Sequence, residues 1–448
     1  MGRSTFKGGI HIYDRKDLSM DMPITILLPK GDLVFPLSQH IGAPAKALVA
    51  KGDRVLVGQK IGEAAGFISA NVISSISGTV KDIEKRLTVQ GDLVESIVIN
   101  NDHEYITVED FGKERDYKKL SKKEIREIVK EAGITGLGGA GFPTHVKLTP
   151  ENDDKIEYII VNGAECEPYL TSDYRRMLEE ADKLVSGLKI MLQLFEKAKG
   201  IIAIEDNKPQ AINAVKEAAA KESNIEVRVL KTKYPQGGER QLVYAVTRRK
   251  LNSKKLPADV GCIVDNIDTV IAIYNAVALN TPLIHRTLTV SGKAIKKPGN
   301  FEVLIGTDYS ELLEAAGGFV AKPEKIISGG PMMGNALFNI NVPVTKRSSA
   351  LLAFVVDDAA LSETPCIRCG RCLTACPLGL MPFELALLSM HGEEDAFTKG
   401  GGLECCGCGC CSYICPAKKG LTQSIFQQRN IILEKNKKKS KKVQEVKA

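Results

Sequence analysis

Ten of the twelve cysteines in this 448-residue chain lie between Cys366 and Cys415, and they follow a repeating pattern. The first run, C-x2-C-x2-C-x3-C-P, consists of Cys366, Cys369, Cys372 and Cys376 followed by Pro377. The same spacing returns at Cys405, Cys408, Cys411 and Cys415 before Pro416. Two complete runs of thiols at ligand spacing predict that this region folds around bound metal, because the cysteines are too clustered for a disulfide framework spread over a small secreted chain.

The spacing within each run is that of bacterial ferredoxin-type 4Fe-4S ligation. In proteins with two such clusters, the fourth cysteine of each run ligates the other cluster. We therefore predict one cluster on Cys366, Cys369, Cys372 and Cys415, and a second on Cys405, Cys408, Cys411 and Cys376. Structural zinc is the alternative, although a zinc site needs only four thiolates and the two runs provide eight. Cys406 and Cys410 have no ligand role in this assignment.

The charge is concentrated at the carboxyl end. The net charge is +7, but residues 435–448 contain seven lysines and one glutamate, so the rest of the chain is close to neutral. A general basic field for nucleic acid is therefore absent, and we predict no nucleic-acid partner. Such a tail usually stays solvated and disordered, and attraction to an anionic membrane or an acidic partner is its alternative role.

No apolar run approaches the roughly 18 residues of a membrane span, and the start, MGRSTFKGGIHIYDRKDL, has no apolar signal-peptide core. We therefore expect no spanning segment and no export signal.

Hydrophobic patterning predicts a multidomain α/β protein. After an N-terminal arm (1–21), short strands and glycine turns indicate a β barrel-sandwich domain (22–105), which we interpret as a docking module because its hairpin tip has no carrier lysine. Alternating strands and helices predict an α/β domain (118–284), and strands around one short helix predict a small α+β domain (285–345). A helical domain with the cysteines (360–432) and the basic tail (433–448) complete the chain.

Two further segments contain candidate binding residues. Gly136, Gly138, Gly139 and Gly141 form a glycine loop, whose backbone amides can approach a phosphate or a flavin closely. An unliganded turn is equally compatible with such a loop. Asn162, Glu165 and Glu167 follow a predicted strand, at the edge where an α/β sheet places ligands. A helix cap would also use such residues.

Several phrases together resemble a known family. GGAGFPTHVK, NGAECEPYLTSDYRRM, YPQGGERQL and VDNIDTV resemble the flavoproteins that include the NADH-binding subunit of respiratory complex I. FKGGIHIYD, CIRCGRCLTACPLGLMP and SGGPMMG are similar to the RnfC proteins of the Rnf ion-pumping electron transport complexes. The resemblance runs from about Phe6 to Leu421 and implies that residues 285–345 are a soluble-ligand-binding β-grasp (SLBB) domain.

The resemblance also implies the cofactors and their contacts. FMN would lie under the glycine loop, with Lys147 near its phosphate and Asn162, Asp265, Asn266 and Thr269 around it. NADH would stack on the flavin near Glu165, Glu167, Tyr234 and Glu239. Ala164 and Gly238 replace acidic residues of the complex I pattern, so the implied nicotinamide contacts rest on fewer matching residues.

The implied function is that of a peripheral subunit of an ion-translocating ferredoxin:NAD oxidoreductase on the cytoplasmic face of the cell membrane. FMN would exchange hydride with NAD(H) and single electrons with two 4Fe-4S clusters. The implied partners are ferredoxin, a ferredoxin-like subunit and membrane-embedded subunits, which Arg368, Arg371, Lys418 and Lys419 would help to recruit unless they are simply solvated. A cobalamin reductase of the propanediol-utilisation type and a non-catalytic iron-sulfur scaffold are the alternatives.

Overall fold

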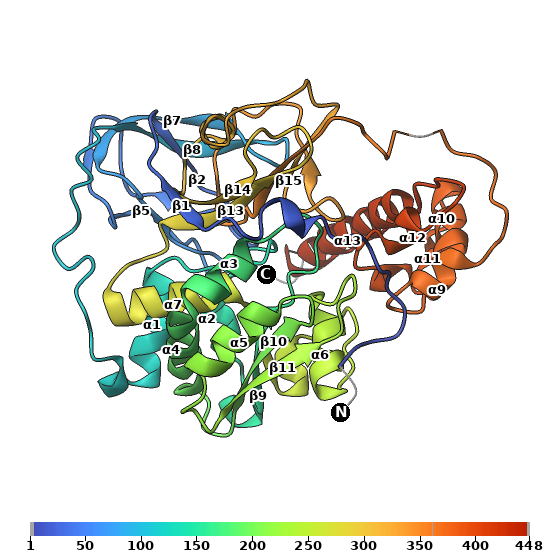
Figure 1. Ribbon diagram of the computed structural model, residues 1–448, viewed down its shortest axis with the longest axis horizontal. Coiled ribbons are helices and arrows are strands. Elements are labelled where there is room, and N and C mark those ends of the chain that lie inside the picture. Colours follow the sequence, from blue (N-terminus) through green and yellow to red (C-terminus); the bar gives the residue numbers. More distant parts are fainter. Residues whose placement is uncertain (1–3, 361, 446–448) are drawn as a thin grey trace.

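The computed structural model describes residues 4–360 and 362–445, and Figure 1 shows the β-rich part of the chain above the α/β domain, with the cysteine-rich helices to one side. The barrel-sandwich region contains two antiparallel sheets. One has the strand order β2 (Leu33–Pro36), β8 (Leu93–Asn101), β7 (Gly78–Leu87) and β4 (Arg54–Val55). The other contains β3 (Lys46–Ala47), β5 (Lys60–Glu63) and β6 (Val72–Ile73). Leu33 and Phe35 of β2 and Ile97 to Ile99 of β8 are buried in the core between the sheets.

Strand β1 (Ile24–Leu27) differs from the expectation. The sequence suggested that it belongs to the barrel-sandwich domain, but it pairs in parallel with β14 (Gly299–Leu304) of the third domain, in the register Ile24 to Asn300. No residue of β1 is fully buried, so its position depends mainly on backbone pairing with a strand far away in sequence.

The α/β domain is built on a four-stranded parallel sheet with the order β11 (Ile225–Leu230), β10 (Lys199–Glu205), β9 (Tyr158–Gly163) and β12 (Cys262–Asn266). The chain runs outward from β9 to β11 and then returns to the other side of β9. The point of reversal lies between β9 and β12, and such switch points are where doubly wound sheets bind ligands.

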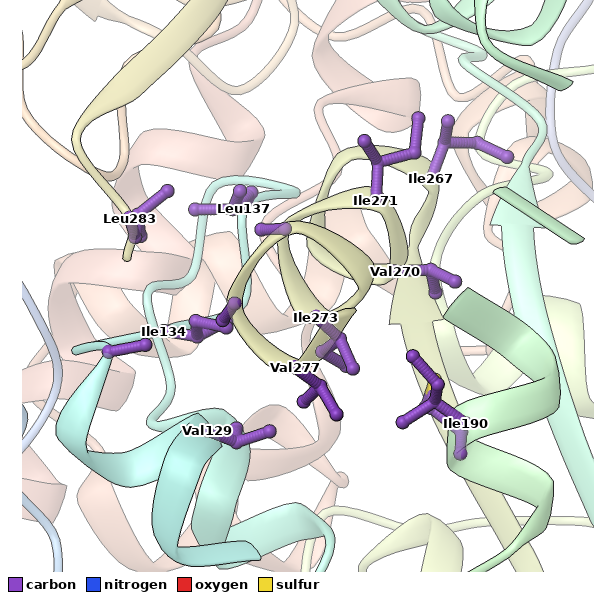
Figure 2. Close-up of a cluster of buried hydrophobic side chains, with 14 of the residues drawn as sticks. Val129, Ile134, Leu137, Ile190, Ile267, Val270, Ile271, Ile273, Val277 and Leu283 are labelled. Atoms are coloured by element: carbon purple, nitrogen blue, oxygen red, sulfur yellow. The ribbon is translucent and has the colours of Figure 1, made fainter. Parts of the chain in front are cut away.

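The helices of this domain follow the predicted apolar periodicity with one break. They are α1 (Lys122–Glu131), α2 (Thr144–Lys147), α3 (Ser172–Glu179), α4 (Ala181–Leu192), α5 (Pro209–Ala218), α6 (Glu239–Thr247) and α7 (Ile267–Leu279). The helical segment that begins at Ser172 is divided into α3 and α4 at Glu180, where φ is −135°. Helix α7 is apolar on nearly all sides, and Figure 2 shows its side chains among Val129, Ile134, Leu137 and Ile190. The centre of this core is therefore a helix that begins at the switch point.

The third domain contains a six-stranded sheet with the order β1, β14, β13 (His285–Ser291), β17 (Ala350–Phe354), β15 (Lys325–Ser328) and β16 (Asn335–Ala336). Helix α8 (Tyr309–Ala315) packs on the core of this sheet. Strand β17 lies beyond the expected boundary at residue 345 and pairs in parallel with β13. The sheet therefore includes residues that lie between the two domains predicted at 285–345 and 360–432.

The cysteine-rich region is helical, with α9 (Arg371–Ala375), α10 (Pro382–Met390), α11 (Glu394–Lys399), α12 (Cys410–Tyr413) and α13 (Leu421–Glu445). Leu385, Phe397, Leu421 and Ile425 form its small core. The tail differs from the expected disorder because α13 continues through Glu445. Lysine is a good helix former, and the packed first turns of α13 provide a nucleus from which the helix extends. The expected arm and tail also include residues 1–3 and 446–448, which lie outside the described residues.

Candidate redox site

The carboxyl ends of β9 and β12 bring two candidate residues together at the switch point. Asn162 and Asn266 are opposite each other in the strand register. The side-chain amide of Asn162 donates to the Gly237 carbonyl oxygen (2.9 Å), which joins β9 to the loop before α6. Asn266 is the N-cap of α7, and its side-chain amide donates to Asp173 (2.6 Å). Both asparagines therefore connect the sheet edge to neighbouring loops.

The glycine loop lies over the first turn of α7. The Leu137 amide donates to Thr269 Oγ1 (2.9 Å), and a side chain at Gly138 would contact Asn266. Within the described residues, no protein group accepts a hydrogen bond from the backbone amides of Gly138, Gly139 or Ala140. A Cβ atom at Gly139 would meet nothing within 4 Å. The loop thus presents uncommitted donors beside open space, which fits a phosphate or a flavin.

Lys147, at the end of α2, forms an ion pair under the loop. Its ammonium group donates to Asp265 Oδ1 (3.0 Å) and to the Val264 carbonyl oxygen (2.8 Å). Asp265 is 1% exposed, and its Oδ2 accepts no hydrogen bond from the described residues. Burial raises the pKa of Asp265, while Lys147 opposes that shift. Burial likewise raises the pKa of Glu239, which feels the charges of both Lys147 and Asp265.

Glu165 and Glu167 both have structural partners. Glu165 Oε1 accepts from the Asp173 amide (2.7 Å) near the start of α3, which agrees with the helix-cap interpretation of this segment. Glu167 Oε2 accepts from the Met332 amide (3.0 Å). A Cβ at Gly330 would come within 2.2 Å of that oxygen. The NGAECEP segment therefore connects the α/β domain to the SGGPMMG loop of the third domain.

Two buried lysines that the sequence analysis did not identify hold the same segment. Lys16 donates to the Glu167 carbonyl oxygen (3.1 Å) and lies 3.6 Å from Glu165 Oε2. Lys208 donates to the Ala164 carbonyl oxygen (2.6 Å). Its position directly before Pro209 at the start of a helix was the only sequence signal. Gln236 was also missed: it is fully buried, and neither side-chain polar atom has a partner among the described residues.

Tyr234 lies where the α/β domain meets the cysteine-rich domain. It packs with Ile10, Ala375, Cys408 and Cys410 in one buried cluster. Its hydroxyl donates to Glu167 Oε1 (3.5 Å), and burial raises the pKa of this phenol. The N-terminal arm crosses the same junction, since the Gly9 amide donates to the Ala375 carbonyl oxygen (2.8 Å) and Ile10 pairs with Tyr234. The cysteines and the sheet edge are thus in direct structural contact.

The eight motif cysteines surround two cavities. A cavity of about 510 Å³ is lined by Cys366, Cys369, Cys372 and Cys415. A second and much narrower cavity, about 20 Å³, is lined by Cys376, Cys405, Cys408 and Cys411, together with Cys406 and Cys410. The fourth cysteine of each run therefore lies with the first three of the other run.

The donor sets around these cavities fit iron-sulfur clusters. Each is lined by four motif thiols, and the Leu380 amide donates to Cys376 Sγ (3.3 Å), as backbone amides commonly do toward cluster sulfurs. Within residues 4–360 and 362–445, no group of three or more Cys, His, Asp or Glu side chains is arranged to hold a single metal ion.

Three family models match successive parts of the chain. Residues 4–104 match the RnfC barrel sandwich hybrid domain, residues 129–275 match the Nuo51 FMN-binding domain, and residues 287–336 match the SLBB domain. The expected multidomain α/β fold class is confirmed, and an FMN-binding domain coincides with the switch point and the glycine loop.

Curated relatives match most of the chain, including the cysteine-rich region. The C component of the proton-translocating ferredoxin:NAD(+) oxidoreductase complex of Clostridium ljungdahlii is 47% identical, over 88% of this chain and 86% of its own length. The C component of the Na(+)-translocating complex of Acetobacterium woodii is 42% identical, over 97% of this chain and 98% of its own length. The chain belongs to this RnfC family. Members are thus named for complexes that move different ions.

Family membership confirms the resemblance inferred from the sequence. The C component of an ion-translocating oxidoreductase complex of Rhodobacter capsulatus is a further relative, 39% identical over 89% of this chain and 77% of its own length. The barrel-sandwich match and these names do not favour the cobalamin reductase or the scaffold alternative.

A solved structure shares part of the fold. A chain of the NAD+-reducing [NiFe]-hydrogenase in the air-oxidized state aligns with a TM-score of 0.51 at 19% identity, covering 65% of this chain and 55% of that one. At this identity the likeness concerns the fold alone. In the part of the chain that the structure describes, no helix combines the length and the hydrophobicity needed to cross a bilayer.

Proposed function

We propose that this chain is the peripheral electron-transfer subunit of a membrane-bound, ion-translocating ferredoxin:NAD oxidoreductase. When bound, FMN supplies the exchange between hydride, a two-electron unit, and the single electrons that iron-sulfur clusters accept. The FMN-binding domain match and the donor-rich glycine loop support the flavin part of this proposal. The family relationship supports membership of the complex, and therefore partners that include its membrane-embedded subunits.

At the flavin site, the chain contributes position and electrostatics. The glycine-loop amides and the first turn of α7 are suited to anionic groups, since both present backbone N-H donors. Lys147, Asn162, Asp265, Asn266 and Thr269 surround this loop and would hold FMN. Glu165, Glu167, Tyr234 and Glu239 lie on the side where we place NADH. Of this second group, Glu167 and Tyr234 are hydrogen-bonded to each other beside the cysteine-rich domain.

The observation that carries the proposal is the arrangement of the two cysteine cavities relative to the flavin domain. The cavity with Cys408 and Cys411 adjoins Tyr234, whereas Cys366 and Cys369 line the other cavity and are exposed. We assign one 4Fe-4S cluster to each cavity, with Cys376, Cys405, Cys408 and Cys411 as the ligands nearer the flavin. Cys366, Cys369, Cys372 and Cys415 would hold the other cluster, which would supply electron exchange with the partner.

The surface around the outer cavity supports a protein partner. Ile367 is 69% exposed and Met390 is 77% exposed beside it, and exposed apolar side chains at a rim are typical of interaction sites. Arg368 and Arg371 flank the same loop and suit an acidic, ferredoxin-like subunit, while Lys419 is partly committed to Glu363 (3.1 Å). We place this surface on the cytoplasmic face, where ferredoxin and NAD(H) are found.

The test is a redox titration of the purified full-length chain, followed by EPR, with iron, sulfide and FMN counted in the same sample. We expect about eight irons and about one FMN, and NADH should reduce at least the cluster nearer the flavin. Zinc in place of iron, or clusters that dithionite reduces but NADH does not, would contradict the proposal. The same counts on a Cys262→Ser variant serve as the control for cysteine loss outside the cavities, because Cys262 is buried in the α/β sheet away from both of them. Its iron and sulfide content should equal that of the unmodified chain.

A further inference from the structure

Arg347 lies beside the glycine loop although it belongs to a different domain. It is in the segment that leads into β17 of the third domain, and its Nε donates to the Gly139 carbonyl oxygen (3.0 Å). A Cβ at Gly141 would meet Arg347 Cγ at 2.8 Å, so the absence of a side chain at Gly141 allows this close contact. The guanidinium group is therefore held next to Gly139, at the exposed tip of the loop.

The charge of Arg347 is not compensated. The buried arginines Arg176 and Arg286 both form ion pairs with Asp268, so their charges are compensated. Arg347 is half-buried, and no carboxylate among the described residues forms an ion pair with it. Burial alone lowers the pKa of Arg347, and a partly desolvated cation without a counter-charge is costly unless an anion completes the site.

The other cation of the loop is already paired. Lys147 binds Asp265, so its positive charge is largely neutralised. By contrast, the backbone amides of Gly138, Gly139 and Ala140 have no acceptor among the described residues, a Cβ at Gly139 would meet nothing within 4 Å, and the guanidinium group of Arg347 is bonded to this same loop at the Gly139 carbonyl. Arginine presents several N-H donors in a planar fork, which matches the oxygens of a phosphoryl group.

We propose that Arg347 is a phosphate-binding residue of the cofactor site, supplied to the glycine loop by the third domain. This inference rests on the proposed function, because the phosphoryl group belongs either to FMN or to the pyrophosphate of NAD(H). It gives the third domain a direct role at the flavin site in addition to its structural one.

The experiment compares ligands with and without phosphate on the full-length chain. FMN is removed, and FMN and riboflavin are titrated back by fluorescence quenching; NADH and reduced nicotinamide riboside are then compared on the FMN-loaded protein. In the Arg347→Gln variant we expect affinity for one phosphorylated ligand to fall roughly 10- to 100-fold, as for loss of a charge-assisted hydrogen bond. The unphosphorylated counterpart should change less than about twofold, since it makes no contact with the guanidinium group.

Selective loss of FMN binding assigns the monophosphate, and selective loss of NADH binding assigns the pyrophosphate; either result supports the proposal. Equal losses for riboflavin and FMN would show that Arg347 only positions the loop through Gly139, and no loss for any ligand would also overturn the proposal.

Lys293→Gln removes an exposed cation from the same domain and is the matched control. Arg347→Lys should retain part of the phosphate preference, and thermal melting confirms that each variant is folded. A wild-type chain that binds no flavin would refute the proposed function instead.

Discussion

At the scale of single residues, burial changes the chemistry of Glu167. Its carboxyl group lies among Tyr234, the Met332 amide and the Lys16 region, where water is largely excluded. Burial disfavours the ionised form and raises the pKa of Glu167 to about 7. The pKa of a glutamate in an unfolded chain is about 4.3. The folded chain therefore binds this proton more tightly than the unfolded chain does between these two pH values.

The consequence is a stability that falls as pH rises through this window. Because the folded state holds more protons there, Glu167 lowers the free energy of unfolding by up to about 1.4 kcal/mol per pH unit. Glu167→Gln keeps an acceptor for the Met332 amide but cannot ionise. We expect its melting temperature to rise relative to wild type between pH 5.5 and 7.5. The exposed Glu95→Gln variant is the control, and a constant difference between Glu167→Gln and wild type across this range would contradict the prediction.

At the scale of elements, the N-terminal arm joins domains that are distant in sequence. Ser4 pairs with Leu230 at the sheet edge, and Ile10 pairs with Tyr234. Gly8 packs directly on the Cys376 carbonyl group, with φ at +79°. The arm therefore supports the loop that supplies Cys376 to the cavity nearer the flavin.

A side chain at Gly8 should loosen this contact. In Gly8→Ala the new Cβ would lie 2.4 Å from the Cys376 carbonyl oxygen. Gly112→Ala is the matched control, since Gly112 has φ of +76° but its Cβ would meet nothing within 4 Å. Both variants suffer the left-handed backbone cost of about 1–2 kcal/mol. We expect Gly8→Ala to lose a further 1–3 kcal/mol of stability, roughly the cost of overpacking, and to lose iron faster on chelation. Equal behaviour of the two variants would show that the arm contact is unimportant.

Local sequence signals predicted most elements but not their partners. The capping box of Ser121 and Glu124 marks the start of α1 as its pattern indicates. The division between α3 and α4 at Glu180 and the pairing of β1 with β14 were not predictable, because both depend on contacts with distant residues. Arg176 in α3, for example, pairs with Asp268 in α7.

At the scale of the whole molecule, a polar contact closes the junction between the flavin domain and the cysteine-rich domain. Glu404 accepts from Arg240 Nη1 (2.9 Å), from the Ser253 amide (2.7 Å) and from Ser253 Oγ (2.7 Å). Together with the Tyr234 cluster, this contact sets the distance between the two redox regions. Electron transfer between them should therefore depend on Glu404.

Glu404→Ala should weaken this junction by about 1 kcal/mol. The expected loss is small because the Arg240–Glu404 ion pair is partly exposed, and solvent screens it. We expect NADH to reduce the clusters more slowly in this variant, while it reduces FMN at the wild-type rate. Stopped-flow absorbance separates the two steps. Glu394→Ala, which removes a pair with Lys435 inside the cysteine-rich domain, is the control; slower FMN reduction in Glu404→Ala would point to a different role.

The proposed order of clusters can be tested by removing one at a time. Cys369→Ser disrupts the outer site, so NADH should still reduce the inner cluster, and one EPR signal should remain. Cys408→Ser disrupts the inner site, and we expect NADH to reduce the outer cluster at least about tenfold more slowly, with dithionite reducing it normally. The opposite pattern would reverse the proposed order. Cys406→Ser and Cys410→Ser should keep both clusters.

Cysteine spacing and hydrophobic periodicity were sufficient to predict the metal-binding region and the α/β pattern, because ligand geometry and periodicity are local properties of the chain. The family was predicted from the resemblance of several sequence phrases. Contacts between remote segments could not be read in this way. The pairing of β1 with β14, the ion pair of Lys147 with Asp265, the anchoring of NGAECEP by Lys16 and Lys208, and the approach of Arg347 to Gly139 all join residues far apart in sequence. Their partners are set by how the domains pack, since burial and uncompensated charge arise only when the chain is folded.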